Sequence, residues 1–139
     1  MSFEEKSTWI YAVIAAVLPV GYFTTVLGQL RTTAAADIDF QGPLMAAIGA
    51  AIGLSIAAHI LVAIAAPDDA GKRDQRDKDI NRYGEYVGGL VLSVAAVVPL
   101  VLAISEADHF WIASAIYLAF VLGAVTGSIV KIVAYRRGL

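Results

Sequence analysis

Cysteine is absent from the 139 residues of this chain. Thiol–disulfide chemistry, cysteine-ligated zinc and iron–sulfur clusters are therefore excluded as functions. The sequence motifs of many enzymes are missing too, because there is no glycine-rich phosphate loop, no HExxH and no GxSxG. No acid, base and nucleophile stand in a recognisable arrangement. We expect a protein that is not an enzyme and that holds no cofactor and no metal ion.

Charge is missing from four long apolar stretches. Residues 9–27, 43–66, 86–104 and 110–130 contain no Asp, Glu, Lys or Arg. Each stretch is long enough for a helix rising about 1.5 Å per residue to cross a hydrocarbon core of about 30 Å. Hydrophobic residues make up 59% of the chain, and its mean hydropathy is +0.74. A soluble protein of this size has too small an interior for such segments, so the sequence predicts an integral membrane protein.

The lipid bilayer restricts the fold class. Backbone groups inside a lipid bilayer must be hydrogen-bonded internally, which favours helices. The sequence predicts a single transmembrane domain over residues 1–139, an all-α four-helix bundle made of two antiparallel helical hairpins. We expect helices near residues 8–28, 43–66, 84–104 and 108–135, with a cytoplasmic loop near residues 67–83. Capping boxes at residues 2–5 and 105–108 predict two helix starts, and Pro19 predicts a kink in the first helix.

Positive charge is nearly absent from one set of loops. Nine of the ten Lys and Arg residues lie before the first stretch, between the second and third, or after the fourth; only Arg31 lies elsewhere. Cytoplasmic loops are the ones enriched in Lys and Arg. We therefore expect a multi-pass protein of the cell membrane with both termini in the cytoplasm. Exporters and fluoride channels that insert in both orientations need nearly balanced loops, so this bias argues against that class.

His59 is the only histidine inside an apolar stretch. It lies about 10 Å from the inner end of the second stretch, at a rise of 1.5 Å per residue. Ser55 lies one turn away, and Ser93 and Thr126 fall at a similar depth. A neutral imidazole needs both a donor and an acceptor, so we expect these four side chains to form an intramembrane polar cluster. Two interpretations stay open: interhelical hydrogen bonding, or a proton relay or ligand site.

Pairs of glycines four residues apart occur in three of the predicted helices. Gly49 and Gly53 form one pair, Gly123 and Gly127 another, and a third pair, at residues 84 and 88, is partly outside the membrane. Such a pair lets another helix backbone approach closely. We expect the first two pairs to pack helices, either within the bundle or between copies in a homo-oligomer.

The central loop carries dense charge of both signs. A charged helix beginning near Gly71 is expected to run on into the third transmembrane helix. Its acidic residues weaken attraction to anionic lipid headgroups, and nothing favours nucleic-acid binding in so balanced a segment. We expect the segment either to dock a cytoplasmic or membrane protein partner, or lipid, or simply to be solvated. The docking residues would be Lys72, Arg73, Arg76, Lys78 and Arg82.

Two segments of the second half resemble one family. Residues 73–84 (RDQRDKDINRYG) are similar to the charged DERDxxIxxRG-type segment of small, uncharacterised bacterial four-helix membrane proteins. Residues 106–112 (EADHFWI) and 131–138 (KIVAYRRG) are similar to their fourth helix. Lys72 and Arg73 stand where that family tends to have Asp and Glu. The resemblance implies the fold and a cytoplasmic charged segment, but no activity and no catalytic residues.

Two functions remain after these exclusions. The first is a non-enzymatic inner-membrane protein that acts as an anchor, accessory or regulatory subunit, through helix–helix self-association and its charged loop. The alternative is a small-solute or ion transporter or channel with a polar path centred on His59.

Overall fold

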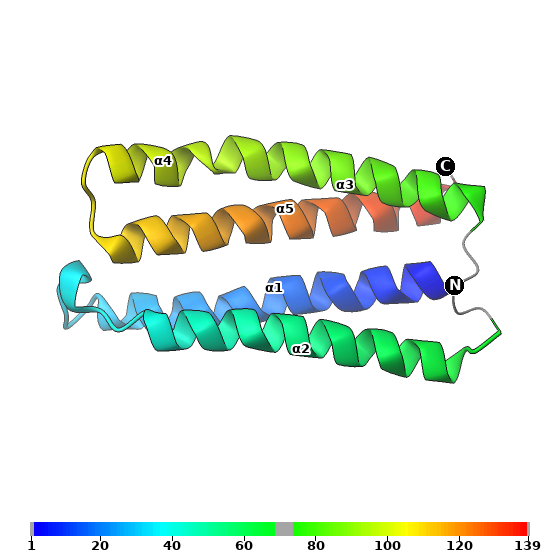
Figure 1. Ribbon diagram of the computed structural model, residues 1–139, viewed down its shortest axis with the longest axis horizontal. Coiled ribbons are helices and arrows are strands. Elements are labelled where there is room, and N and C mark those ends of the chain that lie inside the picture. Colours follow the sequence, from blue (N-terminus) through cyan, green and yellow to red (C-terminus); the bar gives the residue numbers. More distant parts are fainter. Residues whose placement is uncertain (1, 69–73, 139) are drawn as a thin grey trace.

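The computed structural model describes residues 2–68 and 74–138 (Figure 1). These residues form long helices and no strand, so the predicted all-α four-helix bundle is confirmed. The first hairpin holds two long helices joined through a short 3₁₀ helix, and the second holds a helix in two parts and a last long helix. In chain order the elements are α1 (Phe3–Gln29), η1 (Ala35–Asp37), α2 (Gln41–Ala65), α3 (Gln75–Ala95), α4 (Val97–Ile104) and α5 (His109–Arg137).

The two hairpins lie side by side, and their neighbouring helices run in opposite directions (Figure 1). Helices α1 and α5 are in the middle and pack on each other, while α2 packs along α1 and α3 packs along α5. The two chain ends, the end of α2 and the start of α3 lie at one end of the bundle. The 3₁₀ helix η1 and the turn between α4 and α5 lie at the other end.

Of the two helix starts predicted from capping boxes, the first is capped by its serine. The Ser2 hydroxyl accepts a hydrogen bond from the Glu5 amide at 3.1 Å and begins α1. The box predicted at residues 105–108 is wrong, because the Ser105 hydroxyl instead donates to the Leu102 carbonyl at 3.0 Å. Glu106 has a φ of 55°, a left-handed conformation that turns the chain after α4. Ser105 therefore ends one helix and does not begin the next.

The two mid-membrane prolines have different effects. Helix α1 continues through Pro19 without interruption, whereas the third crossing is divided at Ala96, three residues before Pro99. Pro99 has no amide hydrogen with which to bond the carbonyl four residues earlier, so the helix is weakened there. An interruption is found in the third crossing, where it separates α3 from α4, whereas α1 is unbroken at Pro19, the position at which the sequence predicts a kink.

The buried core lies at the η1 end of the bundle. Tyr22 and Val26 of α1 and Phe110 of α5 are at most 3% exposed. The Tyr22 hydroxyl and the Ser114 hydroxyl share a hydrogen bond of 2.9 Å, which joins α1 to α5. The rings of Tyr22 and Tyr117 meet edge to face at 5.0 Å. The two hairpins are therefore joined firmly in this half of the molecule.

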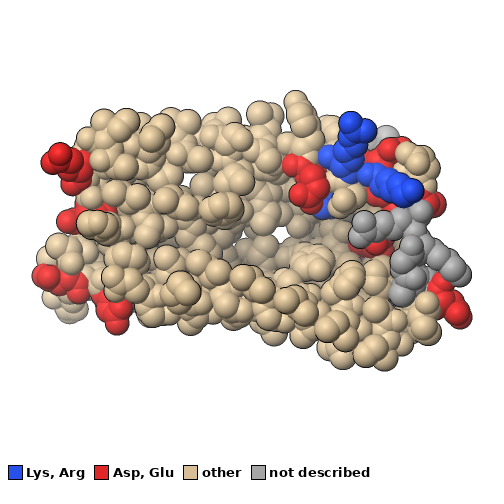
Figure 2. Space-filling view, viewed as in Figure 1, with Lys and Arg blue, Asp and Glu red and all other residues tan. Residues whose placement is uncertain are grey.

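Within the part of the chain that the structure describes, four helices are long and apolar enough to cross a membrane: Phe3–Gln29, Gln41–Ala65, Gln75–Ile104 and His109–Arg137. Large apolar side chains cover their outer surfaces; Leu61 and Ile64, for example, are 65% and 70% exposed. Figure 2 shows acidic side chains at both ends of one face and basic side chains at its right-hand end, with a wide uncharged band between the two ends. A water-soluble monomer rarely exposes so large an apolar surface, so the fold indicates a multi-pass membrane protein.

Candidate functional site

A cleft of about 550 Å³ separates the two hairpins in the half of the bundle that holds the chain ends. Figure 2 shows the surface hollowed there. The cleft ends at Phe120 of α5. This residue lies about one helical turn from Tyr117, which packs against the buried core. Its lining residues come from α1 (Glu4, Ser7, Thr8, Tyr11), α2 (His59), α3 (Asn81, Gly84, Glu85, Gly88, Gly89, Leu92) and α5 (Phe120, Gly123, Ala124, Gly127, Ser128, Lys131).

Glycines bring α3 and α5 into close contact along one wall of the cleft. A Cβ atom added at Gly88 would lie 2.7 Å from the Gly123 carbonyl oxygen, and one added at Gly127 would lie 3.0 Å from the Gly84 carbonyl oxygen. Such spacing lets two helix backbones touch without intervening side chains. This hairpin is therefore compact, and the open space lies between it and α1.

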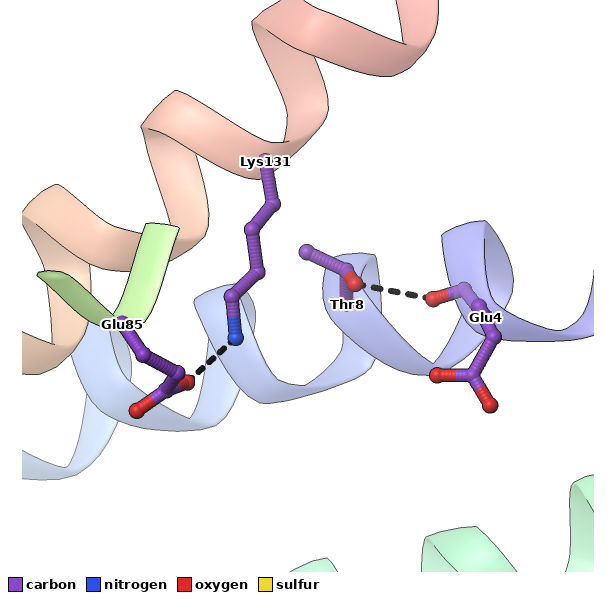
Figure 3. A network of polar contacts seen from close by, with 4 residues as sticks. All are labelled: Glu4, Thr8, Glu85 and Lys131. Carbon is purple, nitrogen blue, oxygen red and sulfur yellow. Dashed lines mark hydrogen bonds and ion pairs between the residues drawn. The ribbon is translucent and has the colours of Figure 1, made fainter. Parts of the chain in front are cut away.

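An ion pair lies at the mouth of the cleft. The Lys131 ammonium of α5 bonds to the Glu85 carboxylate of α3, as Figure 3 shows. The Lys131 side chain is 15% exposed, whereas that of Glu85 is 71% exposed. A carboxylate has about four acceptor positions and an ammonium three donors. Both groups therefore keep capacity for a further polar ligand.

Ser7 has a buried hydroxyl without a hydrogen-bond partner among the described residues. The residue is 7% exposed and lines the cleft beside His59. Thr8 next to it is satisfied, because its hydroxyl donates to the Glu4 carbonyl at 2.8 Å (Figure 3). A buried polar atom left unpaired is destabilising, so the Ser7 hydroxyl marks a position where a ligand atom would be favoured.

The predicted polar cluster is not assembled. His59 lines the cleft and meets the Phe3 ring edge to face at 5.6 Å. The Ser93 hydroxyl donates instead to the Gly89 carbonyl of its own helix at 2.8 Å. Ser55 and Thr126 do not line the cleft. The physical reason is the open bundle, in which α2 packs along α1 and lies away from α3.

The glycine pairs divide into two groups. Gly123 and Gly127 pack within the bundle, against the pair at residues 84 and 88 that the sequence analysis set aside. Gly49 and Gly53 face open space, with nothing within 4 Å of a Cβ added at either position. Packing within the bundle is therefore wrong for the α2 pair, and contact between copies is the interpretation that stays open.

The basic segment is only partly available for docking. Helix α3 begins at Gln75, after the side chain of Asp74 accepts a hydrogen bond from the Asp77 amide at 2.7 Å. Arg76 donates to the Tyr135 carbonyl of α5 at 3.3 Å. Lys78 and Arg82 are exposed. Lys72 and Arg73, and the predicted helix start near Gly71, lie outside the described residues.

Sequence reasoning missed Ser7, Glu85 and Lys131. A signal for two of them exists, because Glu85 directly precedes the third apolar stretch and Lys131 directly follows the fourth. In an antiparallel hairpin these positions lie at the same depth, so opposite charges there are a signal for an ion pair. Ser7 carries no comparable signal, since its burial depends on how the hairpins pack.

No family model, no curated protein and no solved structure matches this chain. The resemblance of the second half to small bacterial membrane proteins therefore stays a prediction. Across residues 2–68 and 74–138, no three His, Asp or Glu side chains stand close enough together to hold a metal ion.

Proposed function

We propose that this chain is a non-enzymatic multi-pass protein of the inner membrane, which serves as an anchor, accessory or regulatory subunit of a membrane assembly. The observation that supports this proposal best is how little of α2 is buried. Of its 25 residues, only Ala47 is buried. A helix that packs on one neighbour keeps most of its surface for a second partner.

The outer face of α2 suits contact with another helix. Gly49 and Gly53 are one turn apart and have open space in front of them. Lipid tails are as apolar as the side chains, so helices associate in membranes mainly through close packing, which small residues permit. The face therefore fits a second copy of α2 in a homo-oligomer.

The cytoplasmic end would supply a second contact. Lys78, Arg82 and Tyr86 follow each other at four-residue spacing on α3 and are exposed. Tyr86 is 69% exposed, and the neighbouring Tyr83 is 60% exposed. Aromatic and arginine side chains are enriched in protein interfaces, so this surface fits a protein partner with acidic groups.

Self-association through α2 can be tested with single cysteines, because the natural chain has none. We expect Gly53→Cys to form a covalent dimer in membranes after mild oxidation, since two such faces would meet. Gly21→Cys on α1 is the matched control, because it also faces open space. Dimers of both variants in equal yield, or of neither, would contradict the proposal. Solute flux in liposomes that is lost in His59→Ala would favour the transporter hypothesis instead.

A further inference from the structure

We propose that the cleft between the hairpins binds one phospholipid whose headgroup carries a primary amine. In this arrangement the headgroup lies at Glu85, Lys131 and Ser7, and the upper acyl chains lie toward Leu92 and Phe120. The inference does not depend on self-association or on a protein partner. It requires only that the helices stand in a bilayer.

The polarity of the cleft changes with depth as that of a lipid does. Asn81 and Glu85 on α3 and Lys131 on α5 flank the apolar stretches, at the level of a membrane interface. Leu92 and Phe120 line the deeper part. Glu85 and Leu92 are about 10 Å apart along the helix axis, at a rise of 1.5 Å per residue. The hollow opens on the lateral face of the bundle (Figure 2), where lipid molecules are its neighbours.

The charges select a headgroup that carries both signs. One carboxylate, Glu85, and one ammonium, Lys131, line the cleft as an ion pair. A purely anionic headgroup would meet the Glu85 carboxylate as well as the Lys131 ammonium. A headgroup with an ammonium and a phosphate finds an acceptor in the Glu85 carboxylate and a donor in Lys131. Such charge-assisted hydrogen bonds are stronger than neutral ones.

The Ser7 hydroxyl favours a primary amine over a quaternary one. It is buried at the cleft and bonds to none of the described residues. A primary ammonium can donate hydrogen bonds to a hydroxyl or a carboxylate of the lining, whereas a trimethylammonium group has no N–H to donate. The lining therefore fits an ethanolamine-type headgroup better than a choline-type headgroup.

Native mass spectrometry of the full chain tests this site. The protein would be purified in mild detergent and offered phosphatidylethanolamine, phosphatidylglycerol and phosphatidylcholine in equal amounts. We expect one retained phosphatidylethanolamine per protomer. Lys131→Met keeps the apolar stem but removes the phosphate donor, and should lower that retention about tenfold. Lys78→Met, on the exposed side of α3 and away from the cleft, is the control and should leave it unchanged.

Ser7→Ala separates ligand binding from a structural role. Removing a buried, unpaired hydroxyl should leave the bundle folded and at least as stable, yet it should lower the preference for phosphatidylethanolamine over phosphatidylcholine. Unchanged preference in Ser7→Ala would overturn the assignment. So would equal retention of the three lipids by the natural chain, or a preference for phosphatidylglycerol or phosphatidylcholine. Lipid retained per protomer is counted whether or not the chain dimerises, so this result stands apart from the cross-linking experiment.

Discussion

Gly88 and Gly89 are neighbours in sequence but stand in different surroundings. Gly88 faces α5, where an added Cβ would lie 2.7 Å from the Gly123 carbonyl oxygen. At Gly89 an added Cβ would have nothing within 4 Å. Substitution of these two glycines therefore separates two effects within one turn of α3. A change at Gly88 tests helix packing, and the same change at Gly89 tests helix propensity.

We expect Gly88→Ala to lower the free energy of unfolding by about 1–3 kcal/mol, because the backbones of α3 and α5 must move apart to accommodate the methyl group. Gly89→Ala should be neutral or stabilising by about 0.5–1 kcal/mol, since alanine has the higher helix propensity. Equilibrium unfolding in mixed detergent micelles measures both. Equal effects at the two positions would mean that this helix contact is not as close as described.

The sequence identified glycine spacing as important but could not say which pairs touch. Spacing alone does not show which face of a helix points to its neighbour, and the pair at residues 84 and 88 was set aside as partly outside the membrane. The same is true of His59. The sequence gives the depth of this residue in the membrane but not the direction in which its side chain points. Contacts between helices depend on rotation about each axis, which a chain rich in alanine and glycine specifies weakly.

Helix α3 extends beyond the apolar stretch into the polar region, where it stays packed on α5. Ile80 is 5% exposed, and the Tyr135 hydroxyl donates to the Asp77 carboxylate at 3.1 Å. This packing holds the first turns of α3 against α5 and leaves Lys78 and Arg82 exposed. A charged surface on a packed helix suits contact with a partner.

Reversing both charges, with Lys78→Glu and Arg82→Glu, should release any cytoplasmic partner without unfolding the bundle, because neither side chain is buried. Affinity purification in mild detergent with quantitative mass spectrometry measures this. The control is Arg31→Glu, an exposed cation in the loop at the opposite end. A stoichiometric companion retained equally by the double variant and the control would show that docking occurs elsewhere.

The extents of the helices were largely readable from the sequence, because apolar length and charge define a crossing. Interruptions within the helices were harder to predict from the sequence. Pro19 and Pro99 stand in similar surroundings, AAVLPV and AAVVPL, yet only the third crossing is divided. A proline removes one hydrogen bond in either case. Whether the helix is then interrupted depends on the packing around it, which the local sequence does not contain.

The whole molecule is an open bundle, joined at one end by an aromatic core and separated by a cleft in the other half. At the level of the chain ends the hairpins meet again, where the Arg136 guanidinium lies 5.5 Å from the centre of the Trp9 ring. The sequence predicts a polar cluster from residues of similar depth on the second, third and fourth crossings. Helix α2 packs along α1 and lies away from α3, so the structure does not bring these side chains together.

We expect the chain to cross the membrane four times with its Lys- and Arg-rich end in the cytoplasm. Single cysteines test it directly, since the natural chain provides a cysteine-free background. Asp39→Cys and Lys78→Cys would be exposed in intact cells to a maleimide that cannot cross membranes. We expect Asp39→Cys to be labelled at once and Lys78→Cys only after the membrane is permeabilised. Labelling of both in intact cells, or the reverse order, would contradict the account.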